Sequence, residues 1–268
     1  RVDLAGGWSG PVQMATYGPS PPRARGIRHP VYARALVLDN GAARLALVSC
    51  DLLIMHRGLR EAVLEKLAAR DADFDGVMLS ATHTHTSVGG YVDNALFEFY
   101  MLGKFDPEWT DHLAARIADS ITRANNSLRE ARLGCGRTFV TDASHNRRFG
   151  KTIDPELALI KITDRDEKPL ALVVNFAGHP ILDPDDGLVS PDYPGLLARK
   201  LDADFGFGFF LQGALGDLNA GSRERSDKWK QAGLANSIAE RLHKAIAEAY
   251  DAIPVRAEIR LTSLTASF

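Results

Sequence analysis

The chain has 268 residues, of which 45% are hydrophobic and 25% charged, the composition of a globular protein with a sizeable core. Its 32 basic and 34 acidic residues give a formal net charge of −2, so nucleic acid is excluded as an expected partner because no positive surplus could hold a polyanion. No apolar run approaches the roughly 18 residues needed to cross a bilayer, so we expect no transmembrane segment.

The first residue is Arg1, with neither an initiator Met nor a charged-then-apolar leader. A processed leader is one explanation, which favours a secreted or periplasmic location over a cytoplasmic one. Two cysteines, Cys50 and Cys135, lie in apolar stretches typical of strands, so we expect buried free thiols and no disulfide framework.

The first half of the chain predicts a hairpin followed by a strand–helix–strand unit. Two apolar runs, 32–38 and 44–52, are separated by Asp-Asn-Gly at 39–41, which is typical of a two-strand hairpin with an Asn-Gly turn. Apolar residues recur at helical spacing over 57–69, and a short buried strand is expected over 77–80. This order predicts a βαβ unit with parallel strands.

The rest of the chain alternates between amphipathic helices and apolar strands. We predict helices over 107–125, 194–201 and 228–250, and strands over 132–140, 157–163, 170–176, 207–211 and 255–261. Asp106 should cap the helix at 107, because a proline follows it at the first helical position. Residues 164–168 read as the turn of a second hairpin. The elements predict a single α/β domain over 1–268, with a mixed, largely parallel sheet covered by helices.

The segment 80–90, Ser-Ala-Thr-His-Thr-His-Thr-Ser-Val-Gly-Gly, begins where a buried strand is expected to end. Residues two apart in an extended segment point the same way, so the rings of His83 and His85 can converge beyond the sheet edge. Neutral imidazole suits zinc, and Gly89 and Gly90 would let backbone approach a substrate. Taken alone, the pair could equally well hydrogen-bond to nearby hydroxyls.

A third histidine, His179, also follows directly on an apolar strand, 170–176. Two strands that each end in histidine can bring these side chains to the same edge of a sheet, where α/β folds place their ligands. The sequence therefore favours a metal site at the C-terminal ends of strands.

Three acids and one arginine lie at comparable places. Asp51 and Asp217 follow strands, and Asp192 precedes a helix, so each is a candidate for an additional metal ligand or for a partner of one, although a capping or turn role is the alternative. Arg147, within Asn-Arg-Arg at 146–148, could clamp a carboxylate or stabilise an oxyanion, the alternative being a solvated basic turn.

These motifs, in this order, resemble the neutral/alkaline, non-lysosomal ceramidase family over nearly the whole chain. The matching pieces are Tyr32-Ala33-Arg34-Ala35, Val48-Ser49-Cys50-Asp51, Ser80-Ala81-Thr82-His83-Thr84-His85 with Gly89-Gly90, Asn146-Arg147, Phe176-Ala177-Gly178-His179, Ser190-Pro191-Asp192-Tyr193-Pro194-Gly195 and Gln212-Gly213-Ala214-Leu215-Gly216-Asp217. The resemblance implies a zinc amidase that cleaves the N-acyl bond of ceramide, a lipid substrate, to sphingosine and fatty acid. It also implies that His83 and His179 are zinc ligands, and that His85 and Arg147 orient substrate and stabilise charge.

The family takes its remaining zinc ligands, a glutamate and a tyrosine, from a region beyond the position where this chain stops at Phe268. Three explanations stay open: a catalytic domain truncated at its C-terminus, replacement by a nearer acid such as Asp51 or Asp192, or an incomplete site. Alternative functions are hydrolysis of another N-acyl or ester substrate and a non-catalytic binding module. A serine hydrolase is disfavoured because no Gly-X-Ser-X-Gly motif occurs.

Overall fold

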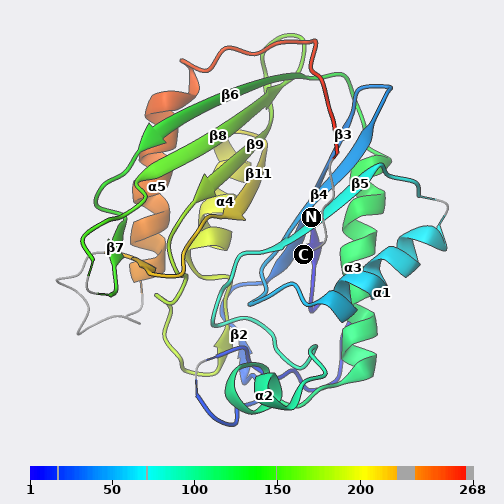
Figure 1. The fold of residues 1–268 in the computed structure, drawn as a ribbon, viewed down its shortest axis with the longest axis vertical. Helices are drawn as coiled ribbons and strands as arrows, with labels where there is room; N and C mark the ends of the chain where they lie inside the picture. Colours follow the sequence, from blue (N-terminus) through cyan, green and yellow to red (C-terminus); the bar gives the residue numbers. More distant parts are fainter. Residues whose placement is uncertain (17, 71, 149, 222–232, 264–268) are drawn as a thin grey trace.

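The computed structural model describes residues 1–16, 18–70, 72–148, 150–221 and 233–263. Its main elements form two four-stranded sheets, each covered by helices (Figure 1). The first sheet has the order β1-β3-β4-β5 and consists of β1 (Val2–Asp3), β3 (Tyr32–Asp39), β4 (Arg44–Cys50) and β5 (Gly76–Ala81). Helices α1 (Arg57–Ala68) and α3 (Pro107–Asn125) pack on one face of this sheet and enclose the first hydrophobic core.

Local signals place these elements as the sequence predicts. The β3–β4 hairpin is confirmed: its turn is held by Asn40, whose side-chain oxygen accepts from the amides of Ala42 and Ala43, while Gly41 adopts a φ of 80° that glycine allows. Asp106 caps α3, accepting from the amides of Glu108 and Trp109 at 3.0 Å. Strands β4 and β5 are parallel and joined through α1, which confirms the predicted βαβ unit.

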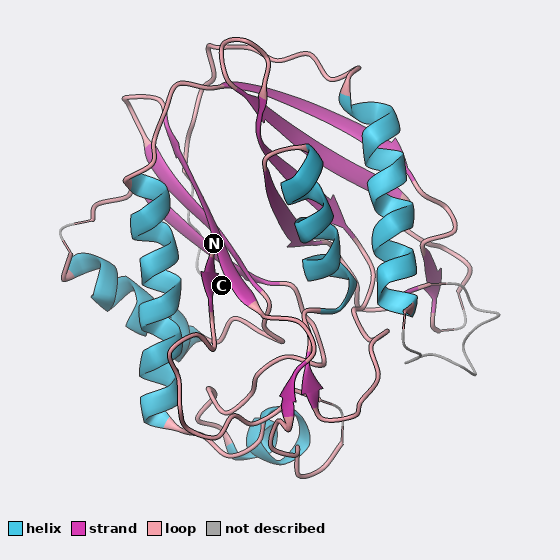
Figure 2. Cartoon of the chain, turned by 180° about the vertical axis from the view of Figure 1, so that it is seen from behind, coloured by secondary structure: helices cyan, strands magenta, loops and turns pink. Residues whose placement is uncertain are grey.

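The second sheet has the order β11-β9-β8-β6. Its strands are β6 (Arg132–Phe139), β8 (Glu156–Thr163), β9 (Pro169–Phe176) and β11 (Phe207–Gln212), and helices α4 (Asp192–Asp204) and α5 (Leu234–Tyr250) pack against it around the second core. Strands β9 and β11 are parallel and joined through α4, so this half contains a βαβ unit of its own. Figure 2 shows α1 and α3 on the outer side of the first sheet and α4 between that sheet and α5.

Short elements complete the chain near the ends of these strands. They are the parallel pair β2 (Gly26–Ile27) and β10 (Leu188–Val189), the antiparallel pair β7 (Ser144–Asn146) and β12 (Leu218–Ala220), and the helical turns α2 (Ala95–Phe97) and η1 (Glu98–Leu102). Within the described ranges, we find no candidate for a membrane-spanning helix.

The expectation of a largely parallel sheet is wrong. The fold is mixed α/β, but it has two mixed sheets, and each contains a single parallel pair, β4–β5 in one and β9–β11 in the other. The remaining pairs are antiparallel, because two of them, β3–β4 and β8–β9, are hairpins whose short turns reverse the chain.

Three local predictions also need correction. The strand expected over 255–261 is absent, and a single bridge between Leu133 and Arg256 stands in its place. The last helix begins at Leu234, after Gly233 with a φ of 91°, while residues 228–232 of the predicted helix lie outside the described residues. Cys50 is buried as expected, but Cys135 is exposed because it lies on the uncovered face of the edge strand β6.

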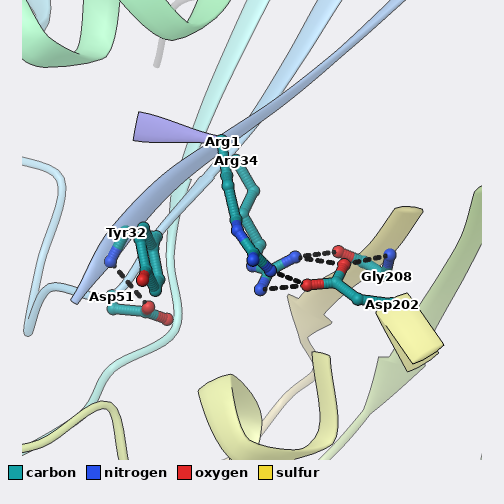
Figure 3. A network of polar contacts seen from close by, with 6 residues as sticks. All are labelled: Arg1, Tyr32, Arg34, Asp51, Asp202 and Gly208. Carbon is teal, nitrogen blue, oxygen red and sulfur yellow. Dashed lines mark hydrogen bonds and ion pairs between the residues drawn. The ribbon is translucent and has the colours of Figure 1, made fainter. Parts of the chain in front are cut away.

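The two halves are joined by a buried arginine (Figure 3). Arg34 of β3 is 2% exposed; its guanidinium donates to the carboxylate of Asp202 in α4 at 2.8 and 3.0 Å and to the carbonyl of Gly208 in β11 at 2.9 Å. Burial lowers the pKa of Arg34 to about 10, so it remains charged at neutral pH. Ser49 of β4 adds a bond to the Phe210 carbonyl of β11 at 2.5 Å. The first sheet is thereby fixed against α4 and β11 of the second.

Candidate metal centre

The loop after β5 carries His83 and His85. The strand ends at Ala81, and the backbone then turns at His83, which has a φ of 66°, while the His83 amide donates to the Leu52 carbonyl at 3.0 Å. The His83 and His85 rings lie edge to face with centroids 4.9 Å apart. The two rings therefore converge as predicted. The cause is the left-handed backbone conformation of His83, and not an extended segment in which residues two apart point the same way. Such a conformation is costly for a residue other than glycine.

The loop after β9 carries His179 to the same place. Its amide donates to the Leu218 carbonyl at 2.8 Å, and His179 forms a parallel bridge with Asn219 of β12. The carbonyl of the next residue, Pro180, accepts from the His85 amide at 3.3 Å. Direct backbone contact therefore holds the loop from the second sheet against the loop from the first.

The three imidazoles form one cluster. Ring centroids are 4.9 Å apart for His83 and His85, 5.0 Å for His83 and His179, and 5.9 Å for His85 and His179. One nitrogen from each ring lies within 4.8 Å of the other two. Since one ion can bridge donors at this spacing after small ring movements, and imidazole nitrogen is a preferred zinc donor, the residues fit a zinc ion.

Hydrogen bonds and burial keep two of these rings in the form that a metal requires. His83 Nδ1 lies 2.8 Å from the Leu53 carbonyl and His179 Nδ1 lies 3.0 Å from the Leu218 carbonyl. A carbonyl only accepts, so each Nδ1 carries the hydrogen and each Nε2 keeps its lone pair. Burial lowers the pKa of His83, and lowers that of His179 to about 4; the positive charge of Arg147 adds to both shifts. Both rings are neutral at neutral pH.

The lowered pKa of His179 predicts how the stability of the metal-free protein depends on pH. The folded pKa is about 4 against an ordinary 6.5, so the unfolded chain binds the proton first as the pH falls. The contribution of His179 to folding is therefore fully present above pH 6.5 and is lost towards pH 4. In urea unfolding between pH 7.5 and 4.5, we expect a His179→Gln variant to lose less stability than the original protein. Equal losses would contradict the prediction.

Arg147 is exposed and directly follows β7, in the connection that leads to β8. Its Nη2 and Nε donate to the Gly216 carbonyl at 2.9 and 3.3 Å, and its amide donates to the Asp217 carbonyl at 2.8 Å. The Asp217 carboxylate accepts from the side-chain amide of Asn146 at 2.7 Å. Asp217 thus joins segment 216–217 to segment 146–147, and these two segments hold the guanidinium. The positive charge of Arg147 lowers the pKa of His83 and His179.

Asp51 is buried next to the loop that carries His83. It is 3% exposed, and its carboxylate accepts from the Tyr32 amide at 2.9 Å, a contact drawn in Figure 3. Burial raises its pKa to about 6 despite this hydrogen bond and the charge of Arg34. The Ser87 hydroxyl donates to the backbone carbonyl of Asp51, and this bond links the end of β4 to the loop that carries His83 and His85.

Asp192 is the first residue of α4 and is fully buried. Its carboxylate accepts from the amides of Leu182, Asp183 and Tyr193 at 2.7, 2.9 and 2.6 Å. Burial, with the nearby Asp183 carboxylate, raises its pKa to about 7. Sequence reasoning missed Tyr193, whose hydroxyl donates to the Gly178 carbonyl at 2.6 Å; the available signal was an aromatic residue beside an acid already singled out.

In the described part of the chain, the cluster of side chains that could hold a metal ion contains the three histidines and none of Asp51, Asp192 and Asp217. The hydrogen bonds above give each of these acids a structural task, and a role as additional metal ligand stays a prediction.

Gly89 and Gly90 are buried rather than displayed on a loop surface. A Cβ on Gly89 would lie 2.2 Å from the Leu102 carbonyl oxygen, and Gly90 has a φ of 78°. The Gly89 amide donates to the Gln13 carbonyl at 2.7 Å, and the indole of Trp109 donates to the Gly89 carbonyl at 2.8 Å. Close packing accounts for glycine at position 89 and the positive φ accounts for it at position 90, while contact with substrate stays a prediction.

Comparison with known proteins places these features in a family context. A family model described as neutral/alkaline non-lysosomal ceramidase, N-terminal, matches residues 1–207. Among curated relatives, the neutral ceramidase of Pseudomonas aeruginosa is 27% identical over 240 residues, covering 83% of this chain and 36% of the relative. The neutral ceramidase of Drosophila melanogaster is 28% identical over 224 residues, covering 73% and 32%. The chain spans about a third of the length of these relatives.

Solved structures show the same fold. The crystal structure of neutral ceramidase from Pseudomonas aeruginosa superimposes with a TM-score of 0.78 at 23% identity, covering 92% of this chain and 43% of that one. A structure described as ceramidase complexed with C2 gives a TM-score of 0.75 at 23% identity, covering 92% and 42%.

Proposed function

Because the chain belongs to the neutral/alkaline non-lysosomal ceramidase family, we propose that it hydrolyses the N-acyl bond of ceramide or a related N-acyl lipid, with zinc held by His83 and His179. The family match confirms the resemblance in the sequence. The observation that carries the proposal is the meeting of three imidazoles from loops that follow strands of two different sheets, with a nitrogen of each within 4.8 Å of the others.

Zinc suits this donor set because two of the rings are neutral and fixed by backbone carbonyls. When bound, zinc would lower the pKa of water and polarise a carbonyl group, the chemistry that amide hydrolysis at neutral pH needs. The family resemblance implies a glutamate and a tyrosine as further ligands, and a nearer acid such as Asp51 or Asp192 in their place, or an incomplete site, are the alternatives.

The chain's own residues would then orient the amide and balance its charge. Water adds to the carbonyl carbon, the C–N bond breaks, and the amine leaves with a proton, giving fatty acid and a sphingoid base. The Arg147 guanidinium, held by Gly216, is suited to stabilise the negative charge that develops on the carbonyl oxygen. His85 would orient the substrate and pass a proton towards the leaving nitrogen.

Replacing Arg147 by alanine should separate catalysis from metal binding. We expect turnover to fall about 100-fold to 1000-fold, the usual cost of losing one donor to an oxyanion, while the zinc content stays unchanged. The exposed neighbour Arg148 offers a matched control, because Arg148→Ala removes the same charge from the same loop. Comparable losses in both variants would assign the effect to the net charge of the loop and contradict the role of Arg147.

The proposal is tested with N-acyl sphingosines of graded acyl length, assayed on protein supplemented with zinc. A ceramide hydrolase should lose activity steeply as the acyl chain shortens, because an apolar chain contributes binding free energy with every buried methylene. Activity independent of acyl length would instead indicate hydrolysis of another N-acyl or ester substrate.

A non-catalytic binding module is the second candidate. It is favoured by one observation, that no carboxylate joins the three histidines in the described residues. Elemental analysis after zinc supplementation separates the two: about one zinc per chain supports the enzyme, and none supports the module.

A further inference from the structure

The segment that carries His179 is anchored on both sides by two consecutive residues of α4. On one side, the Tyr193 hydroxyl donates to the carbonyl of Gly178, the residue directly before His179, at 2.6 Å. On the other side, the Asp192 carboxylate accepts from the amide of Leu182 at 2.7 Å, and from that of the next residue at 2.9 Å. The chain between these two anchors contains His179 and the Pro180 carbonyl that contacts the other histidine loop.

Both anchors are themselves immobilised by the core. Tyr193 is fully buried, and its ring packs edge-on against Phe176 and Phe210 with centroids 6.4 and 5.7 Å away. Asp192 is also fully buried and has a φ of 52°, a left-handed conformation that aspartate tolerates better than most residues. Its carboxylate additionally accepts from the Tyr193 amide at 2.6 Å, which fixes the two anchors to each other.

We propose that Asp192 and Tyr193 are positioning residues for His179, which hold segment 178–183 so that the His179 ring faces His83 and His85. The hydrogen bond from His179 Nδ1 to Leu218 sets the tautomer, and the two anchors set where the ring stands. The inference rests on the proposed function only in that His179 is taken to be a zinc ligand. The position of the His179 ring should depend on the two anchors in the metal-free protein as well.

Tyr193→Phe tests the inference with a single lost hydroxyl, because the ring and its packing remain. In metal-free protein with ¹⁵N-labelled histidine, we expect His179 to change from a single Nδ1-protonated form to a broadened or mixed signal, while His83 is unchanged. The His179 signal is assigned by its loss in His179→Gln. Affinity for zinc ions alone, measured by competition with a chelator, should fall about 10-fold to 100-fold, as is usual when a group that orients a ligand is removed.

Ser120→Ala is the matched control. Ser120 is 2% exposed and its hydroxyl donates to the Ile117 carbonyl at 2.7 Å within α3, so this variant also loses one buried bond from a hydroxyl to a carbonyl. The His179 signal and zinc affinity of this variant should match those of the original protein. If Tyr193→Phe gives the same spectrum and affinity as Ser120→Ala, the positioning role is wrong.

A second pair of variants tests the other anchor. Asp192→Asn keeps one oxygen acceptor, whereas Asp192→Ala keeps none, so zinc affinity should fall less in the former. Equal affinities in the two variants at equal melting temperature would overturn the role of the carboxylate.

The two hypotheses can fail separately. If the original protein does not hydrolyse any N-acyl lipid but Tyr193→Phe alters the His179 signal, the positioning role stands and the proposed function falls. If the original protein is active and Tyr193→Phe behaves as the control does, the positioning role falls alone.

Discussion

Replacing His83 by alanine is expected to abolish stoichiometric zinc binding and to lower the hydrolysis of N-acyl substrates by about 1000-fold or more. The ring offers a nitrogen to the cluster while its Nδ1 is held by the Leu53 carbonyl, so its loss removes a pre-oriented donor. A 1000-fold loss corresponds to about 4 kcal/mol, within the several kcal/mol that a bound metal contributes to such reactions. Zinc content and turnover measured on the same preparation check the result.

Two further variants make this experiment specific. His83 has a φ of 66°, which asparagine tolerates better than alanine, so His83→Asn removes the imidazole with less backbone strain. His145→Ala removes a ring that is likewise bonded through Nδ1 to a backbone carbonyl, that of Gly221 at 2.8 Å, but is outside the cluster. Full zinc occupancy in His83→Asn would show that His83 is not a ligand, whereas His145→Ala should keep both zinc and activity.

Replacing Asp202 by alanine is expected to lower the free energy of unfolding by about 3–5 kcal/mol. The change leaves the buried charge of Arg34 without its carboxylate partner, and removing the partner of a buried charge is strongly destabilising. The same carboxylate accepts from the Gly208 amide at 2.9 Å, so a contact with β11 is lost as well. Urea unfolding monitored by circular dichroism measures the effect.

An exposed ion pair provides the comparison. Arg57 and Glu61 lie at 2.7 Å on the surface of α1 with side chains 86% and 51% exposed, so Glu61→Ala should cost less than about 0.5 kcal/mol. The double variant Arg34→Met with Asp202→Leu should recover part of the loss, because it leaves no charge buried. A cost for Asp202→Ala as small as that of Glu61→Ala would mean that Arg34 does not join the two halves.

The sequence predicts well those elements whose causes are local. Asp39, Asn40 and Gly41 mark the first hairpin, because the side-chain oxygens of Asp39 and Asn40 and the φ of 80° at Gly41 act within the turn itself. Asp106 marks the start of α3 for the same reason, since its carboxylate reaches amides two and three residues ahead. The three histidines were also predictable, because each follows an apolar strand.

Features that depend on contacts between residues far apart in the chain could not be predicted from the sequence patterns. Alternation of strands and helices does not reveal that the strands form two sheets, since that depends on which edges pair. The left-handed turn at His83 has no local signature, and the anchor from Tyr193 joins it to Gly178 across 15 residues. The segment 255–261 has a strand-like composition, but it pairs with β6 only through the single bridge between Arg256 and Leu133.

The histidines come from loops that belong to different sheets, joined where the Pro180 carbonyl accepts from His85 and the Thr86 carbonyl accepts from the Ser190 amide at 2.8 Å. An ion shared by these loops would act as a non-covalent crosslink between the halves. At a free concentration 1000 times its Kd, it would oppose their separation by about 4 kcal/mol. Amide hydrogens at the ends of β5 and β9 should then exchange with solvent more slowly when zinc is added. The exchange rates at the contact between the two loops would therefore measure zinc occupancy without any substrate.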